Sequence, residues 1–195
     1  MDRALLSWAH AAASRHRSRL PVLWLFTDSR RLPDPRTAAA RLPKGLAGVV
    51  LRHDSEPGRA ALGRDLARIC RSRRLALVVA GDVRLARALR AGVHLRGGRW
   101  PSPLRSVAGW VTSSAHNGLE LARARKAGAG LVFLSPAFAT ASHPGAGGGL
   151  GSLRWNRFAA PANAPVAALG GISGRTVRRL TTRHCRGVGA IGALS

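Results

Sequence analysis

Residues 75–95 read LALVVAGDVRLARALRAGVHL, and this stretch decides the fold class. A continuous apolar run at Leu75–Ala80 is followed by a helical pattern at Val83–Arg90 and by a second apolar run at Gly92–Leu95. Apolar runs without polar alternation indicate strands buried on both faces, which is typical of parallel sheets covered by helices. The stretch therefore predicts a strand–helix–strand unit with parallel pairing.

Apolar runs of this kind recur along the whole chain, with helical patterns between most of them. The runs are Val22–Thr27, Leu46–Leu51, Leu75–Ala80, Gly92–Leu95, Val107–Thr112, Leu131–Leu134, Pro165–Leu169 and Val188–Ala193. The expected helices are Pro57–Arg71, Val83–Arg90, Gly118–Lys126, Leu153–Ala160 and Arg175–Arg183. Two further connections, Pro35–Leu42 and Trp100–Arg105, contain proline, so we expect short or irregular elements there.

Eight buried strands in one chain of 195 residues predict an α/β fold, a single (β/α)8 TIM barrel. The alternative is an open doubly wound sheet, which the absence of G-x-G-x-x-G after the first run disfavours. An extra helix is expected at Arg3–Arg17, and no helix follows the last run. We therefore expect residues 1–20 to form an N-terminal helix that packs on a barrel of residues 21–195 and covers its last strand.

The composition limits the classes of partner. The chain has 32 Lys and Arg against 8 Asp and Glu, a formal net charge of +24. Arginines are spread over every segment, aromatic residues are 5%, and no helix-turn-helix, zinc-finger or RNP pattern occurs. We therefore expect phosphorylated small molecules as partners, and no specific nucleic acid.

The cysteines and the apolar segments bear on localisation. Cys70 and Cys185 have no C-x-x-C spacing, so we interpret them as reduced thiols. No apolar run approaches the roughly 18 residues that span a membrane, and residues 1–20 lack the apolar core of a signal peptide. The sequence therefore predicts a cytoplasmic protein without a membrane partner.

Polar side chains gather where the predicted strands end. Three of the chain's acids, Asp28, Asp54 and Asp82, follow the first three runs, and Ser114 and His116 follow the fifth. Active sites of (β/α)8 barrels lie at the carboxyl ends of the strands. These residues therefore indicate a site at that rim.

The strand ends resemble those of thiamine-phosphate synthases and their TenI relatives. Seven motifs carry the resemblance, in order, from about Leu23 to Leu194. They are Leu25–Asp28 (L-x-T-D), Val50–Arg52 (Q-x-R-E-K), Gly81–Ala86 (N-D-x-x-x-L-A), Ala91–Leu95 (A-D-G-V-H-L), Ser114–His116 (S-x-H), Gly128–Thr140 (G-A-D-Y-v-x-x-G-P-v-F-x-T) and Ala168–Ile172 (A-I-G-G-I). No single motif is specific, but seven in register are.

The resemblance implies a transferase of thiamine biosynthesis. Hydroxymethylpyrimidine diphosphate would lose pyrophosphate, with magnesium helping that group leave, and the thiazole-phosphate nitrogen would capture the pyrimidine cation. TenI relatives instead move a proton to aromatise the thiazole phosphate, and the resemblance makes His116 the proton-transfer residue of that reaction. Barrels of this kind often form homodimers.

The resemblance also implies roles for individual residues. Arg52 would contact the diphosphate, and Ser114 would orient the substrates. Residues that would line the diphosphate loop are Thr140, Ser142 and His143. Residues that would cradle the thiazole phosphate are Gly170, Gly171, Ile191 and Gly192.

The chain departs from the family pattern at the diphosphate and metal sites. Asp54 and His143 stand where the family has lysines, Gly81 replaces an asparagine, and Ala91 replaces the acid of A-D-G-V-H-L, expected to bind metal. One hypothesis is that Asp54 and Asp82 jointly hold magnesium, with Arg52 and Arg96 replacing the lysines. The alternatives are a TenI-like tautomerase that uses His116, and a non-catalytic binder of phosphorylated metabolites or nucleic acid.

Overall fold

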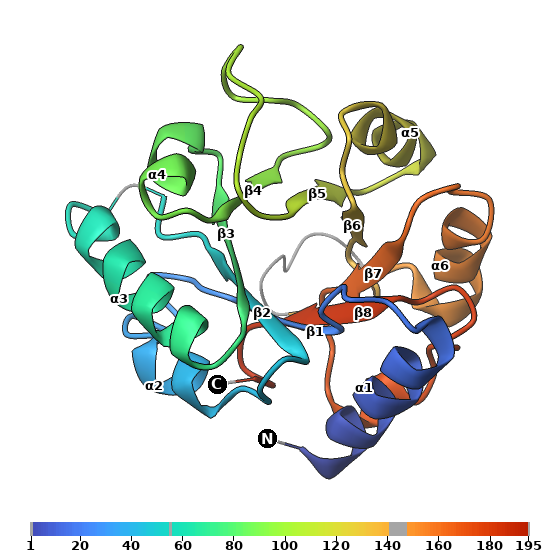
Figure 1. Cartoon of the computed structure of the whole chain (residues 1–195). Coiled ribbons are helices and arrows are strands. Elements are labelled where there is room, and N and C mark those ends of the chain that lie inside the picture. The colour runs from blue at the N-terminus through green and yellow to red at the C-terminus, as the bar shows by residue number, and fades with distance from the viewer. Residues whose placement is uncertain (1, 55, 141–147, 195) are drawn as a thin grey trace.

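The strands of the computed structural model close into a barrel, and the structure describes residues 2–54, 56–140 and 148–194 (Figure 1). Each strand pairs in parallel with its neighbours in chain order, and β8 pairs with β1. The strands are β1 (Leu23–Phe26), β2 (Ala47–Leu51), β3 (Ala76–Ala80), β4 (Gly92–Leu95), β5 (Val111–Ala115), β6 (Leu131–Leu134), β7 (Val166–Leu169) and β8 (Gly187–Ala190). The predicted (β/α)8 fold is confirmed.

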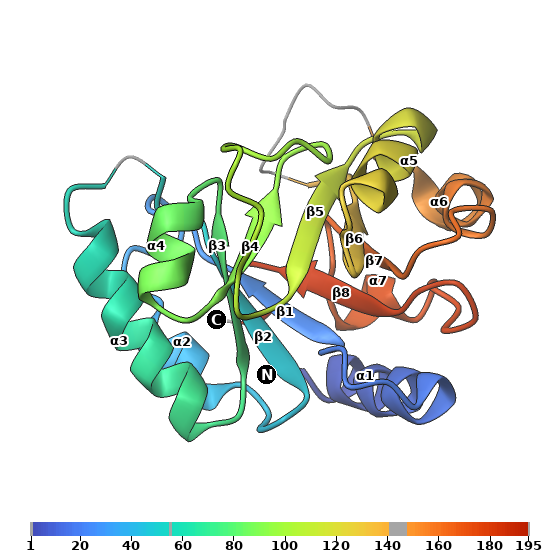
Figure 2. The ribbon, with the colours of Figure 1, turned by 45° about the horizontal axis from the view of Figure 1, so that its top comes forward.

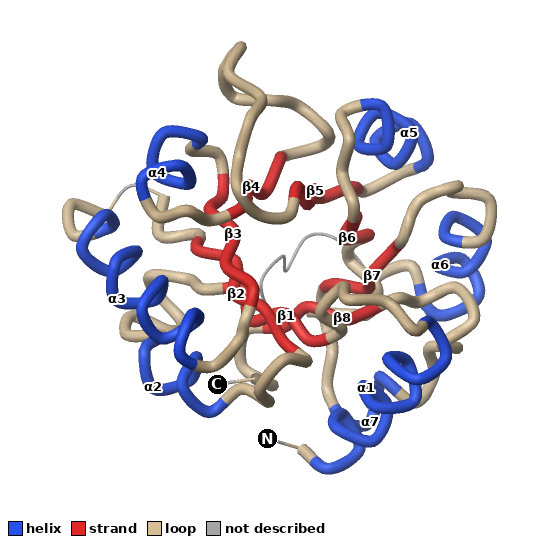
Figure 3. Tube along the Cα trace, viewed as in Figure 1, coloured by secondary structure: helices blue, strands red, loops and turns tan. Residues whose placement is uncertain are grey.

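Helices surround this ring of strands (Figure 3). They are α1 (Arg3–His16), α2 (Arg36–Arg41), α3 (Arg59–Ser72), α4 (Val83–Ala88), α5 (Gly118–Lys126), α6 (Gly151–Ala159) and α7 (Gly174–Val177). Residues 96–110, between β4 and β5, contain no helix, and none follows β8 in the described residues 191–194. Within the described residues, no helix has both the length and the apolar character needed to cross a membrane.

Two predicted elements differ from the structure. The fifth run begins at Val107, but β5 begins at Val111, because Val107 packs with Val93 and Leu95 where a helix would otherwise cover β4. The helix expected at Arg175–Arg183 ends at Val177. Beyond it the backbone forms tighter turns, and the carbonyl of Leu180 accepts a hydrogen bond from a side chain of α1.

The barrel interior is filled by pairing large side chains with glycines. Trp24 and Phe26 point inward from β1 and meet Phe133 edge to face, with ring centroids 5.7 and 4.8 Å away. A Cβ at Gly48 would lie 2.6 Å from the Trp24 ring, and one at Gly189 would lie 2.7 Å from the Phe26 ring. The small strand residues therefore make room for a packed interior, as this fold requires.

Helix α1 lies beside β8 and α7 (Figures 1 and 2). Its buried face belongs to the same apolar layer as Leu23 of β1 and Val188 of β8. The Trp8 indole N–H donates a hydrogen bond to the carbonyl of Leu180 at 3.0 Å. Helix α1 thus packs against α7 and the apolar layer around the strands.

Candidate functional site

A cavity of about 250 Å³ opens at the carboxyl ends of the strands. Its walls come from β1, β7 and β8 and from the loops that follow β1, β2 and β5 to β8. Seven of the residues expected at the site line it: Arg52, His116, Thr140, Gly170, Gly171, Ile191 and Gly192. Phe26, Leu169 and Gly189 add apolar surface, so polar groups converge on a largely apolar hollow, which is typical of small-molecule sites.

Gly170 and Gly171 follow β7 in a backbone conformation that favours glycine, with φ angles of 93° and 64°. Each also lies against the loop after β6. A Cβ at Gly170 would meet Pro136 at 3.1 Å, and one at Gly171 would meet Phe138 at 2.8 Å. The Thr176 hydroxyl donates to the carbonyl of Gly171 at 2.8 Å and holds this turn in place. Both positions therefore require glycine, because of the backbone conformation and because the loop after β6 packs against them.

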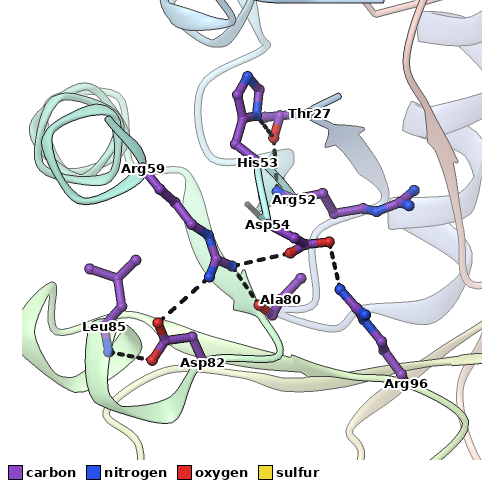
Figure 4. A network of polar contacts seen from close by, with 9 residues as sticks. All are labelled: Thr27, Arg52, His53, Asp54, Arg59, Ala80, Asp82, Leu85 and Arg96. Carbon is purple, nitrogen blue, oxygen red and sulfur yellow. Dashed lines mark hydrogen bonds and ion pairs between the residues drawn. The ribbon is translucent and has the colours of Figure 1, made fainter. Parts of the chain in front are cut away.

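Arg52 is fixed through its backbone. Its N–H donates to Thr27 Oγ1 at 2.9 Å, and Thr27 Oγ1 lies 2.9 Å from His53 Nδ1. Thr27 and His53 are buried, whereas Arg52 is exposed and lines the cavity. Its side chain extends away from Arg59, as Figure 4 shows. The guanidinium is thus presented by a rigid strand end, which suits a diphosphate partner.

His116 lies at the end of β5 and lines the cavity. Its Nδ1 lies 2.9 Å from the carbonyl of Ser135, so Nδ1 donates and Nε2 is the basic nitrogen. Its backbone N–H donates to Glu120 Oε2 at 2.9 Å, and Asn117 caps α5. The ring therefore sits in a fixed orientation with one nitrogen left to act as a base.

Asp54 and Asp82 converge on one arginine (Figure 4). Arg59 Nη2 lies 3.3 Å from Asp54 Oδ1, and Arg59 Nη1 lies 3.6 Å from Asp82 Oδ2. Asp54 Oδ2 also lies 2.5 Å from Arg96 Nη2. Asp82 Oδ1 accepts the N–H of Leu85 at 2.9 Å as the N-cap of α4. Neither acid lines the cavity described above.

This arrangement does not fit a magnesium ion held jointly by Asp54 and Asp82. The guanidinium of Arg59 already contacts both carboxylates. Magnesium requires oxygen ligands in a near-octahedral shell. Across the parts of the chain that the structure describes, no group of three or more His, Cys, Asp or Glu side chains could hold a metal ion. A cation of the chain itself thus occupies the place between the two carboxylates.

Ala91 precedes β4 at its amino-terminal end, beside Gly109 and Trp110. The four residues of β4 separate it from the rim, about 13 Å at about 3.3 Å per residue. An acid at this position could not reach Asp82. The expectation that Ala91 removes a carboxylate from a metal site at the rim is therefore wrong.

The remaining expected residues lie as follows. The Ser114 hydroxyl accepts the N–H of Gly97 at 3.3 Å, and Ser114 is not among the residues that line the cavity. Gly81 has a φ of 65°, which a glycine adopts more readily than the family's asparagine. Ser142 and His143 lie outside the described residues.

His94 is a buried histidine of the barrel interior. Its Nδ1 lies 2.9 Å from Thr112 Oγ1, and its ring meets Phe26 edge to face. Burial, reinforced by the charges of Arg52 and Arg96, lowers its pKa to about 3. His94 is therefore a neutral packing residue at physiological pH.

The sequence reasoning missed Arg59, Arg31 and the contact between His53 and Thr27. Arg59 is the first residue of α3, away from any strand end, so no motif drew attention to it. Arg31 lines the cavity from the loop after β1, three residues beyond Asp28. Its position beside the L-x-T-D motif was the available signal.

Comparisons with known proteins agree with this geometry. The family described as thiamine monophosphate synthase matches residues 23–194. The thiamine-phosphate synthase of Geobacillus kaustophilus is 30% identical, covering 94% of this chain and 88% of that protein. The putative thiamine-phosphate synthase 2 of Aquifex aeolicus is 29% identical, covering 88% of this chain and 96% of that protein.

A solved structure shares the fold. The thiamine phosphate pyrophosphorylase of Pyrococcus furiosus superposes with a TM-score of 0.74 at 23% identity, covering 91% of this chain and 88% of that one. The family match spans seven strand-end motifs and all eight strands. The chain belongs to the thiamine monophosphate synthase family.

Proposed function

We propose that this protein is a transferase that joins hydroxymethylpyrimidine diphosphate to thiazole phosphate, giving thiamine phosphate and pyrophosphate. One observation carries the proposal: a guanidinium from the end of β2 and glycine-rich turns after β7 and β8 meet at a single cavity. The reaction needs a group that binds each phosphorylated substrate. Family membership supports the same reaction.

The chemistry assigns different tasks to the two groups. The bond between the pyrimidine methylene carbon and the diphosphate oxygen breaks, and the pyrophosphate keeps the electron pair. The thiazole nitrogen then forms a bond to that carbon. Arg52 would stabilise the charge that develops on the leaving diphosphate. The backbone at Gly170, Gly171 and Gly192 would hold the thiazole phosphate near the reacting carbon.

The proposal extends to the setting of the reaction. Cys70 and Cys185 are buried, free thiols, which supports work in the reducing cytoplasm. The substrates are phosphorylated small molecules. We also propose a homodimer, from the resemblance alone.

The test is formation of thiamine phosphate from the two substrates, with and without magnesium. We expect wild-type protein to form product and Arg52→Gln to reduce kcat/KM at least about a hundredfold. Arg64→Gln is the matched control, because Arg64 is an exposed arginine of α3 and loses the same charge. Absence of product from folded wild-type protein would refute the proposal.

His116 favours a second candidate function, the TenI-like tautomerisation of thiazole phosphate. Its Nδ1 hydrogen bond to Ser135 leaves Nε2 basic at the cavity. One nitrogen could take a proton from one ring carbon and return it to another atom, which conserves atoms and electrons. This function would be selected by three results together: the wild type converts the thiazole tautomer, His116→Gln does not, and the wild type forms no thiamine phosphate. Turnover in neither assay would leave a non-catalytic binder.

A further inference from the structure

Arg59 stands between two carboxylates at the rim of the barrel (Figure 4). Its Nη2 contacts Asp54 and its Nη1 contacts Asp82, at 3.3 and 3.6 Å. Nη2 also donates to the carbonyl of Ala80, the last residue of β3. These contacts tie the start of α3 to the ends of β2 and β3. The two acids therefore share one cation that belongs to the chain itself.

Burial separates the two arginines of this network. The Arg59 side chain is 14% exposed, whereas the Arg96 side chain is 66% exposed. A largely buried guanidinium needs anionic partners, and Asp54 and Asp82 supply them. Asp54 also holds Arg96 by its other oxygen. Arg59 thus neutralises the two acids from its largely buried position, while Arg96 remains accessible to solvent and to a ligand.

Two departures from the family pattern, at positions 54 and 81, both lie beside Arg96. Aspartate at position 54, in place of a lysine, creates the partner that holds Arg96. Glycine at position 81, in place of an asparagine, lies next to the Arg96 side chain: a Cβ there would be in ordinary contact with Arg96 Nε, at 3.9 Å. A cation lost at position 54 is therefore regained from the end of β4.

We propose that Arg59 replaces a divalent metal ion at this rim, and that Asp54 holds Arg96 as the cation that meets the substrate's diphosphate. The role in catalysis rests on the proposed function, whereas the binding of a diphosphate does not. Arg59 is a positioning residue, because its guanidinium is occupied by protein acceptors. The rim carries four arginines, Arg31, Arg52, Arg59 and Arg96, against three acids, Asp28, Asp54 and Asp82, and so keeps an excess of positive charge for a diphosphate.

The first experiment measures metal binding, by the electron paramagnetic resonance of free Mn²⁺ with wild-type protein and Asp82→Asn. Asparagine is as good an N-cap as aspartate, so the variant keeps the start of α4. We expect no stoichiometric uptake of millimolar Mn²⁺ by either protein. One Mn²⁺ bound by the wild type and lost in Asp82→Asn would overturn the proposal.

The second experiment measures the binding of inorganic pyrophosphate by calorimetry in a buffer with EDTA. We expect the wild type to bind, and Arg96→Gln and Arg59→Met each to weaken binding about tenfold or more, equivalent to about 1.4 kcal/mol. Arg59→Lys should restore part of the affinity, and Arg64→Gln should leave it unchanged. No binding by the wild type in EDTA, or unchanged affinity in Arg96→Gln, would overturn the proposal.

Neither experiment requires turnover, so the two proposals fail separately. Metal-free pyrophosphate binding without thiamine phosphate formation would leave this inference standing and refute the proposed reaction. Product formation together with an Asp82-dependent Mn²⁺ site would support the proposed reaction and refute this inference. Arg96→Gln decides the case if Arg59→Met does not fold, because the Arg96 side chain is mostly exposed.

Discussion

Thr27 Oγ1 and His53 Nδ1 lie 2.9 Å apart, and both side chains are buried. His53 Nε2 lies 3.2 Å from the carbonyl of Pro33, so Nε2 carries the proton and Nδ1 accepts from the Thr27 hydroxyl. Thr27 Oγ1 also accepts the N–H of Arg52. A single hydroxyl thus joins the end of β1 to the residue that presents the guanidinium.

Thr27→Val keeps the shape of the side chain and removes both hydrogen bonds. We expect the free energy of unfolding to fall by about 1–3 kcal/mol, because His53 Nδ1 loses its donor. We also expect KM for the pyrimidine diphosphate to rise about tenfold, because Arg52 is displaced. Thr112→Val is the matched control: it breaks the same kind of contact, to His94, and leaves the hydrogen bond of the Arg52 N–H intact. An equal rise in KM in both variants would contradict this role of Thr27.

Gly171→Ala tests the phosphate turn after β7. The new Cβ would meet Phe138 and would have to adopt a φ of 64°. We expect a loss of stability of about 1–3 kcal/mol and a rise in KM for thiazole phosphate larger than that for the diphosphate. Gly128→Ala is the control, because its φ is 82° and no atom lies within 4 Å of the added Cβ. Steady-state kinetics with each substrate varied separately would measure the difference.

The sequence alone predicts most of this fold, because a strand buried on both faces leaves a continuous apolar run. Six of the eight strands lie within the predicted runs; β8 begins one residue before its run, at Gly187, and only β5 is displaced by several residues. Its run begins at Val107, whose apolar side chain covers β4 rather than forming a strand. An apolar residue that replaces a missing helix cannot be told from a strand residue by pattern.

Site residues that directly follow a strand were predictable from the sequence. Arg52, His116 and Gly171 meet at the cavity because the fold brings all strand ends to one rim. Arg59 was not predictable, because it reaches the rim from the first turn of a helix. Ala91 misled because motif similarity does not distinguish the two ends of a strand.

Trp8 tests whether α1 is an integral part of the barrel. Trp8→Phe removes the hydrogen bond to Leu180 and should lower the free energy of unfolding by about 1 kcal/mol. Trp8→Ala also leaves a cavity where α1 packs against α7, and should lower the free energy of unfolding by about 3–5 kcal/mol. Leu153→Ala is the control, because Leu153 is 81% exposed and should change stability by less than about 0.5 kcal/mol. Urea denaturation measures all three.

His94 should make the barrel sensitive to acid. Its pKa is lowered to about 3 in the folded protein by burial and by the charges of Arg52 and Arg96, from an ordinary value of 6.5. Between these two values the unfolded chain binds a proton that the folded chain does not, so stability falls as the pH falls from about 6.5 towards 3. The contribution of this one group is bounded by about 1.4 kcal/mol per pH unit.

His94→Gln separates this contribution from that of the other titrating groups. Glutamine still offers a hydrogen-bond partner to Thr112 and does not titrate. We expect the free energy of unfolding, measured by urea denaturation from pH 4.5 to 7, to fall less steeply in the variant. The difference in slope should approach about 1.4 kcal/mol per pH unit at the acid end of this range and fall to about a quarter of that at pH 7. Parallel curves over the whole range would mean that His94 accepts its proton inside the folded barrel, and that its burial does not hold it neutral.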